Sequence, residues 1–565
     1  MSRRAGPWAA LAAAGAAAAA CSKSEVKDGG GPPVALPGKP TFTVFGLAEV
    51  RGQIGPCGCT SDPLGDLSRT AQMIAEARTA GPVLVVDAGS LLYSKAPIPA
   101  PQQAQEELKA DLLARTYRED LAISALGLGW ADLPQGPAKV RLPRQAANVA
   151  ADAGIPLEKP TVIAVGGAKV GVFGVLANEA VKGLALADPV AAGKAAVAEL
   201  RRGGAQVVIA LVQATSKKDA AALVRGIGGV DLAVAGLGNW TPEPKDVDAE
   251  ATQVGDGWLV IPADRGQVVP RIDVTLRDPP GPLVDAVGRA AAAGRRAAIE
   301  QQLAALDADL ARFATDKAAD PAFVRRKQGE RDQLAAQRDQ LAKQPLAIPA
   351  RGSYFTLEQV RINKTRACSA KVQDAVTAFY RAAGLANAKA AAAAPPAVVP
   401  AGQATFVGNA GCEDCHDDAI KFWKETRHAH AWETLVQRGQ QLDLDCIGCH
   451  VTGWGQPGGA TLAINERLRD VGCETCHGPG SIHVAKGGNE KPPAIVRNPP
   501  QEFCATQCHT KEHSDTFQYE AYMRDVVGTG HGDLLRGRLR KGTTGAELRK
   551  AALDKAGRMG AGCIR

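Results

Sequence analysis

The sequence predicts a multidomain protein in which an α/β sandwich is followed by a helical hairpin and then by a mainly helical or irregular C-terminal domain. Three observations support this prediction. The chain has 565 residues, more than one hydrophobic core can organise. Up to residue 276, short apolar runs alternate with segments of helical spacing. The nine histidines all lie at or after His416, so chemistry that needs imidazole is confined to the C-terminal part.

The composition excludes several classes of protein. Apolar residues make up 45% of the chain and charged residues 22%, a balance that excludes a wholly disordered, a collagen-like or a polytopic membrane protein. The net charge of +7 is slight for this length, and no basic stretch is interleaved with aromatic residues. We therefore expect no nucleic-acid partner.

The first residues resemble an export signal. Residues 1–21 begin with Met-Ser-Arg-Arg, continue as an alanine-rich apolar run and end at Cys21. This end is similar to a bacterial lipoprotein box, although Ala18 stands where leucine is usual. The alternative is ordinary cleavage, which leaves Cys21 a free thiol. The lipoprotein interpretation predicts lipidated Cys21, a flexible tether over residues 22–40, and attachment to a membrane in the periplasm or at the outer membrane of a Gram-negative bacterium.

An α/β domain is predicted over residues 41–280. The expected strands are residues 42–45, 83–86, 161–165, 170–175, 207–212, 232–235 and 258–261. Their order and local sequence resemble the metallophosphoesterase domain of bacterial 5′-nucleotidases. That family binds two metal ions through Asp and His residues that follow the strands, so the resemblance implies the fold and marks the positions where metal ligands should lie.

Those positions lack the ligands of the family. A two-metal phosphoesterase site needs several carboxylate and imidazole groups to hold both ions. No histidine precedes His416. We therefore expect a catalytically inactive binding or scaffold domain without phosphoesterase activity. The matching segments are Gly46-Leu-Ala-Glu49, Asp87-Ala-Gly-Ser90, Leu126-Gly-Leu-Gly129-Trp130, Gln213 and Gly236-Leu-Gly-Asn239.

Two cysteines lie one residue apart in Pro56-Cys57-Gly58-Cys59. This segment resembles an exported branch of nucleotidase-like proteins that carries a Pro-Cys-Gly-Cys motif. A redox pair and a soft-metal site are two interpretations, because thiolates bind copper(I) and zinc. A local disulfide or two partly buried thiols remain equally open.

A helical hairpin is predicted over residues 281–345. Leu303, Leu306 and Leu310 recur at helical spacing, and Asp320-Pro321 is typical of a helix start. We expect the two helices to bury their apolar stripes against each other and to act as a spacer.

The segments after the hairpin are expected to connect domains. Residues 346–386 form a connector with Cys368 in a structural role, and residues 387–404, rich in Ala and Pro, form a linker.

At the other end of the chain, residues 536–565 form a basic tail, which we expect to be solvated.

Three complete Cys-x-x-Cys-His motifs follow this linker, within the domain predicted over residues 405–535. Two thiols at this spacing can form thioether bonds to the two vinyl groups of one heme, and the adjacent histidine can be the proximal iron ligand. Zinc ribbons are the alternative, but zinc does not require a histidine directly after every second cysteine. The motifs predict hemes at Cys412, Cys415 and His416, at Cys446, Cys449 and His450, and at Cys473, Cys476 and His477.

A fourth segment departs from this pattern. Cys504-Ala-Thr-Gln-Cys508-His509 has three residues between its cysteines, a variant that some multiheme cytochromes use. We expect a fourth heme here, with a disulfide and a free His509 as the alternative.

The remaining histidines can supply second axial ligands. Two-imidazole ligation of four hemes needs four more histidines, and five remain. His428, His430, His483 and His513 are the predicted ligands, whereas His531 lies in a Gly-His-Gly segment typical of an exposed turn.

Two longer motifs, Trp-x4-His-x-His-Ala-Trp and Cys-Glu-x-Cys-His-Gly-Pro-Gly-x-x-His, resemble the tetraheme cytochrome c family that accepts electrons from hydroxylamine oxidoreductase. The resemblance implies closely packed, mostly bis-histidine heme c groups. It predicts an exported electron carrier with redox proteins of the cell envelope as partners. One alternative is an oxidoreductase that acts on a small nitrogen or oxygen species at a five-coordinate heme. A 5′-nucleotidase is the less favoured one.

Overall fold

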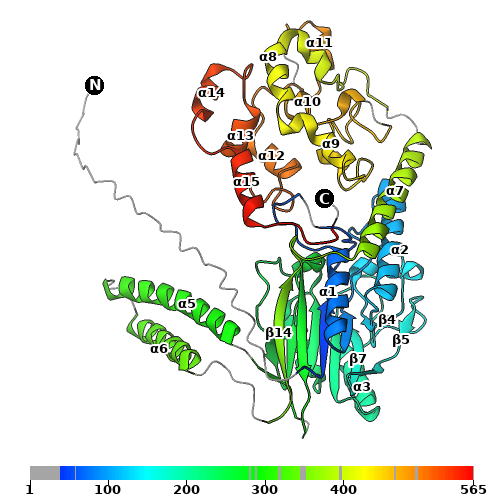
Figure 1. Cartoon of the computed structure of the whole chain (residues 1–565), viewed down its shortest axis with the longest axis vertical. Coiled ribbons are helices and arrows are strands. Elements are labelled where there is room, and N and C mark those ends of the chain that lie inside the picture. The colour runs from blue at the N-terminus through cyan, green and yellow to red at the C-terminus, as the bar shows by residue number, and fades with distance from the viewer. Residues whose placement is uncertain are drawn as a thin grey trace, which may run out of the picture. The chain divides into compact units, whose positions relative to one another are not determined.

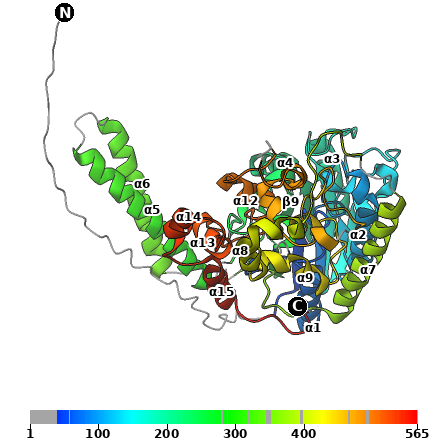
Figure 2. The same cartoon turned by 90° about the horizontal axis from the view of Figure 1, so that it is seen from above.

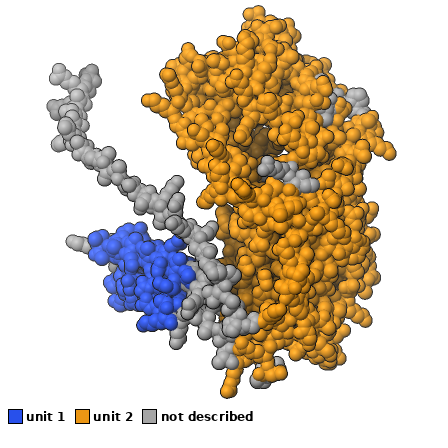
Figure 3. Space-filling model, in the orientation of Figure 1, with its two compact units in different colours: residues 1–37, 288–346 blue, residues 38–287, 347–565 orange. Residues whose placement is uncertain are grey.

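The computed structural model describes residues 39–56, 59–278, 281–286, 289–315, 320–343, 351–393, 398–463, 466–489 and 494–563. Cys21 and Cys57 lie outside the described residues, as do the predicted signal peptide and most of the predicted tether. The chain forms two compact units, residues 1–37 with 288–346 and residues 38–287 with 347–565 (Figure 3), and each is described by itself. Within the described ranges, no helix is both long enough and apolar enough to cross a membrane.

The larger unit contains a sandwich of two six-stranded sheets (Figure 1). The first sheet has the order β13-β14-β12-β1-β2-β3, and the second has the order β10-β11-β9-β8-β7-β6. The first sheet consists of β1 (Phe42–Leu47), β2 (Val83–Asp87), β3 (Ala125–Leu126), β12 (Val268–Thr275), β13 (Val284–Asp285) and β14 (Tyr354–Arg361). The second consists of β6 (Thr161–Val165), β7 (Ala168–Leu176), β8 (Val207–Gln213), β9 (Leu232–Gly236), β10 (Thr252–Val254) and β11 (Gly257–Val260). A short pair, β4 (Arg144–Gln145) and β5 (Leu157–Glu158), lies apart from both.

Successive side chains of a strand point to opposite faces of its sheet, so each sheet packs against the other sheet on one face and against helices on its outer face. In β1, Val44 packs between the sheets in a cluster that includes Ile209, whereas Phe45 packs outward in a cluster with Ile74. The first sheet is covered by α1 (Leu67–Ala80), α2 (Gln103–Glu119) and α7 (Ala370–Ala393), and the second by α3 (Pro189–Arg202) and α4 (Lys217–Ile227). The predicted α/β sandwich is confirmed, and every predicted strand overlaps an observed one.

The segment predicted as a connector, residues 346–386, is described from residue 351, and this described part belongs to the sandwich. β14 pairs with both β12 and β13, and α7 packs against α2. The prediction of a linker over residues 387–404 is wrong at its start, because α7 continues to Ala393. Alanine has the highest helix propensity of all residues, so the alanine run extends this helix.

The C-terminal part of the larger unit is built from short helices and irregular segments, which lie over one end of the sandwich (Figures 1 and 2). A small apolar cluster around Phe406, Trp432 and Ile447 forms its core. The helices are α8 (Glu413–Lys424), α9 (Ala431–Val436), α10 (Cys473–His477), α11 (Ser481–Ala485), α12 (Gln501–Gln507), α13 (Tyr519–Val526), α14 (Asp533–Leu539) and α15 (Gly545–Lys555).

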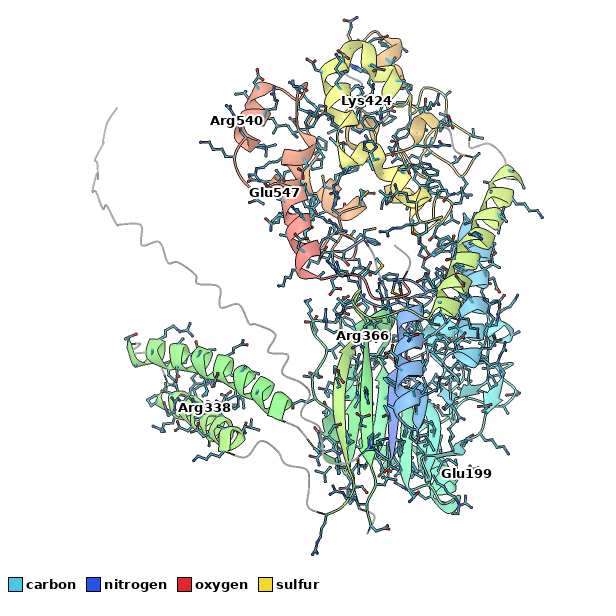
Figure 4. All side chains as sticks on the ribbon, in the orientation of Figure 1. Glu199, Arg338, Arg366, Lys424, Arg540 and Glu547 are labelled. Carbon is cyan, nitrogen blue, oxygen red and sulfur yellow. A yellow bond between two sulfur atoms is a disulfide. The ribbon has the colours of Figure 1, made fainter. Side chains whose placement is uncertain are left out.

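The segment predicted as a solvated tail, which the structure describes to residue 563, is largely exposed, but it is folded and held at its end. α15 begins with a capping box between Thr544 and Glu547, the latter labelled in Figure 4. Beyond α15 the chain returns to the sandwich, where Cys563 forms a disulfide with Cys368 and the Cys368 N–H donates to the carbonyl of Ala561 (2.8 Å). The structural role expected of Cys368 is thus to anchor the end of the chain.

Removal of this disulfide is expected to lower stability. The Cys563→Ser variant should lose roughly 2–5 kcal/mol of unfolding free energy, because the cross-link restricts the unfolded chain over a long loop. Urea denaturation can compare this variant with Cys368→Ser and with the double variant. The double variant should lose no more than either single one, and additive losses would contradict a shared cross-link.

The smaller unit is an antiparallel pair of helices, α5 (Arg289–Thr315) and α6 (Pro321–Lys343). Phe313 and Phe323 meet edge to face, with ring centres 5.6 Å apart, and Arg331 donates to Asp307 (3.0 Å). The Asp320 carboxylate accepts from the Ala322 N–H (2.9 Å), which caps α6.

Candidate heme-binding site

The four cysteine motifs line one large cavity in the larger unit. Its volume is about 2980 Å³, whereas a pocket for one small ligand usually measures ~300–1,000 Å³. The cavity therefore has room for several groups of the size of heme. Every motif cysteine is a free thiol and lines the cavity: Cys412, Cys415, Cys446, Cys449, Cys473, Cys476, Cys504 and Cys508.

Helical turns present these motifs to the cavity. In α10, Cys473 and Cys476 are three residues apart and therefore lie on one face of the turn that ends at His477. In the fourth motif, Cys504 lies in α12 and Cys508 caps it. Residues four apart also share one helix face, so the longer spacing still brings two thiols together.

Burial keeps most of these thiols protonated near neutral pH. It raises the pKa of Cys412 to about 12 and the pKa values of Cys473 and Cys476 to about 11. Cys449 differs, because a hydrogen bond with the Cys508 thiol lowers its pKa. Its sulfur also lies 3.7 Å from the carbonyl oxygen of Gln507, so the second and fourth motifs are neighbours in space although they are distant in the sequence.

Three of the four motif histidines have the Nδ1 atom engaged. His450 Nδ1 lies 2.6 Å from the carbonyl oxygen of Ala431, and His477 Nδ1 lies 2.8 Å from that of Val496. His509 Nδ1 lies 3.1 Å from a serine hydroxyl. A histidine whose Nδ1 is held in this way offers Nε2 to a metal, as metal-binding histidines in proteins usually do.

His428 and His509 form a pair across the cavity. Their ring centres are 6.2 Å apart. Two imidazoles on opposite sides of one metal ion have centres roughly 6 Å apart, since the metal–nitrogen bond is ~2.0–2.1 Å. Burial lowers the pKa of both rings, that of His509 to about 4, which favours the neutral form that binds metals. The spacing and the protonation state both suit axial ligation of one iron.

His531 is a further histidine of this region. Burial, together with the positive charge of His477, lowers the pKa of His531. Nδ1 of His531 accepts from the Gly528 N–H (3.3 Å), unlike Nδ1 of His450 and His477, which lies against a carbonyl oxygen. His531 lines the cavity and is half-buried, so the prediction of an exposed turn is wrong. One sequence feature could have predicted this position of His531: every histidine of the chain lies in this domain.

The other predicted ligands divide into two groups. His416, His483 and His513 line the cavity together with the motif cysteines. His430 is exposed and is not among the lining residues, so the structure does not bring it to the predicted site. The cavity thus has what heme c requires: pairs of free thiols, neutral imidazoles and sufficient volume.

Comparison with known proteins supports this chemistry. Residues 411–478 match the family model for cytochrome c554 and c-prime. Over 96 residues the chain is 40% identical to cytochrome c-554 of Nitrosomonas europaea, a match that covers 14% of this chain and 41% of that protein. The chain carries a cytochrome c554-like domain. The family match implies heme c for this domain, and the chain spans less than half the length of this curated relative.

Solved structures resemble both parts of the larger unit. Reduced cytochrome c554 of Nitrosomonas europaea is 32% identical, with a TM-score of 0.16, over 19% of this chain and 65% of its own. A 5′-nucleotidase precursor of Thermus thermophilus is 21% identical, with a TM-score of 0.34, over 42% of this chain and 51% of its own. At these TM-scores the structural similarity says nothing about the function of this chain.

In the α/β sandwich, packed side chains occupy the region where the nucleotidase resemblance placed metal ligands. The buried Glu49 carboxyl group accepts from the indole N–H of Trp130 (3.2 Å) and from the Gly238 N–H (3.3 Å). The Gln213 amide donates to the carbonyl of Ala88 (3.0 Å). No group of three or more His, Cys, Asp or Glu side chains in the described part of the chain is arranged to hold a metal ion.

Burial of Glu49 predicts a stability that depends on pH. Burial raises its pKa from 4.5 to about 8, so the folded protein keeps a proton that the unfolded chain releases above pH 4.5. Stability should therefore fall as the pH rises from 4.5 to 8, by roughly 3–5 kcal/mol for this group. Urea denaturation at pH 5 and pH 9 should show a smaller difference for Glu49→Gln than for the unaltered protein. Equal differences would mean that Glu49 is ionised in the folded state.

Proposed function

We propose that this protein is an exported multiheme c-type cytochrome that transfers electrons in the cell envelope. The observation that carries the proposal is the set of free thiol pairs and paired imidazoles around one cavity. Heme iron supplies one-electron redox chemistry, and a protein that keeps two imidazoles on each iron changes the coordination little between oxidation states. A shared cavity also keeps the groups close enough to exchange electrons.

About four hemes are proposed, one for each motif. His416, His450, His477 and His509 are the proposed proximal ligands. We assign His428 as the second ligand of the iron at His509, because of the spacing of the two rings. His483, His513 and His531, which also line the cavity, remain for the other three hemes.

Reversible redox titration, followed by visible spectroscopy, tests electron transfer directly. The expected result is several one-electron steps with low-spin spectra that added nitrite or cyanide leaves unchanged. A high-spin signal that shifts with nitrite would favour the alternative, an oxidoreductase with a five-coordinate heme. A protein without any heme absorbance after maturation by a cytochrome c assembly system would exclude both functions.

We infer that the α/β sandwich has no phosphohydrolase activity. The support is the network of Glu49, Trp130 and Gln213 in the region of the family's metal ligands. Incubation with nucleotides and added Mn²⁺ or Zn²⁺ is expected to release no phosphate above the uncatalysed rate. Metal-dependent release that a chelator abolishes would contradict the inference.

Export and membrane attachment through Cys21 are part of the proposal, and redox proteins of the cell envelope are the proposed partners. The support is the alanine-rich run that ends at Cys21. Expression with radiolabelled palmitate should label the protein and place it in the membrane fraction. The Cys21→Ala variant should lose both the label and the membrane association, and a labelled variant would contradict the assignment.

A further inference from the structure

The α/β sandwich contributes to the walls of the heme cavity. Ile54 and Cys59 from the segment after β1, Lys95 from the segment after β2, Lys109 on α2 and Tyr380 on α7 line the cavity with the cysteine motifs. The carboxyl ends of parallel strands are where open α/β sheets usually bind ligands. The cytochrome c554-like domain therefore does not enclose the cavity alone.

Gln105 on α2 is fully engaged with the segment that leads into the second motif. Its side-chain amide donates to Asp443 (2.6 Å) and Asp445 (3.3 Å), and its carbonyl oxygen accepts from the Leu444 N–H (3.1 Å). The Asn387 amide of α7 donates to the same oxygen (2.8 Å). Gln105 is 1% exposed, so these bonds form inside the protein, where an unsatisfied amide would be costly.

Lys109, one helical turn further along α2, forms an ion pair with the same segment. Its ammonium group lies 2.9 Å from Asp445 and 2.6 Å from Glu106, and Lys109 is 5% exposed. Lys95 approaches the other oxygen of Asp445 (3.2 Å). Although burial alone would raise the pKa of Asp445, these two ammonium groups lower it to about 2 and keep the carboxylate charged.

This network reaches a heme-attachment thiol through Asp443. One oxygen of Asp443 lies 3.3 Å from the Cys446 sulfur, which donates to it as a free thiol and loses this proton once it forms a thioether, and the other oxygen accepts from Gln105. The charges of three carboxylates and two ammonium groups thus lie beside the second motif, and the ammonium groups belong to the α/β sandwich. Since charges in a partly buried site are screened less than charges in water, each of them can influence a nearby redox group.

We propose that Gln105 and Lys109 are positioning residues for the second heme-attachment motif, through which the α/β sandwich holds that motif in place and sets the charge beside it. The proposal rests on the proposed function. Through Gln105 and Lys109 the sandwich has a role that needs no catalytic metal. The two parts of the larger unit then form a single redox module.

Redox titration of the full-length matured protein and its variants tests this proposal. The Lys109→Met variant should lower one midpoint potential, because loss of a positive charge favours the more positive ferric state. Asp445→Asn should raise the same potential, and Lys109→Arg should leave it near the original value. The expected change is about tenfold in the redox equilibrium constant, which equals ~59 mV for a one-electron couple.

Opposite shifts for Lys109→Met and Asp445→Asn distinguish electrostatic control from loosened packing, which would move both variants in one direction. Lys217→Met is the matched control, since Lys217 pairs with Asp248 at 2.8 Å on the exposed surface of the sandwich. If Lys109→Met does not fold, Lys95→Met replaces it, since Lys95 pairs with the other oxygen of Asp445 (3.2 Å). If the variants carry all their hemes and their potentials do not change, this inference is overturned while the proposed function stands. If the unaltered protein carries no covalent heme, the proposed function is overturned.

Discussion

Replacing Cys473 and Cys476 together by serine is expected to remove one covalent heme and leave the others attached. Both thiols lie on one face of α10 and line the cavity, and each would hold one vinyl group of the same heme. Intact-mass spectrometry of the matured protein should show a loss equal to one heme. The heme absorbance per chain should fall by about one quarter if four motifs are occupied.

The matched control is the Cys368→Ser/Cys563→Ser variant. It also removes two cysteines of the same unit, but these form a disulfide and not a motif. It should keep every heme while it loses stability. Equal heme content in the two double variants would contradict the assignment of the third motif.

The His428→Ala variant is expected to convert one heme from low spin to high spin. The ring of His428 lies 6.2 Å from that of His509, a spacing that suits two ligands of one iron. Loss of one imidazole leaves that iron five-coordinate, which weakens its ligand field. Electron paramagnetic resonance should record the loss of about one quarter of the low-spin signal, and cyanide should restore it.

His430→Ala is the control for this experiment. His430 is two residues away, yet it is exposed and does not line the cavity. Its removal should leave the low-spin signal unchanged. A spin change in His430→Ala, with none in His428→Ala, would mean that the ligand pair has been assigned to the wrong residue.

Local patterns explain why the cysteine motifs and the strands could be predicted from the sequence. A Cys-x-x-Cys-His motif carries its geometry within five residues, because one helical turn places the thiols on one face. The strands of the sandwich are continuous apolar runs such as β8, which is buried along its whole length. Neither inference needs knowledge of distant parts of the chain.

Contacts between distant segments explain what the sequence could not predict. The partner of Cys368 is 195 residues away, and cysteine connectivity cannot be read from spacing at that distance. The role of α7 depends on Asn387, whose buried amide contacts Gln105 and the carbonyl of Leu442. His531 likewise reaches the cavity only when α13 and the loop after it fold back over α8, where the Thr529 hydroxyl donates to the carbonyl of Asp418 (3.1 Å).

The packing around Glu49 shows what occupies the region of the sandwich where the nucleotidase family has metal ligands. The sequence predicts that a carboxylate stands where the nucleotidase family has Asp-x-His, and the structure places that carboxylate in a buried network with Trp130 and Gly238. A side chain cannot be added at Gly236 without displacing Gln213 or Glu49, whose side-chain atoms would clash with a Cβ at that position. The region is therefore filled, and restoring one ligand would not restore a site.

The number of covalent hemes per chain is the measurement that tests this account most directly. The full-length protein, matured by a cytochrome c assembly system, can be examined by intact-mass spectrometry together with the pyridine hemochrome assay. We expect about four hemes attached through thioether bonds, one for each motif. A chain that carries zinc and no covalent heme would contradict it.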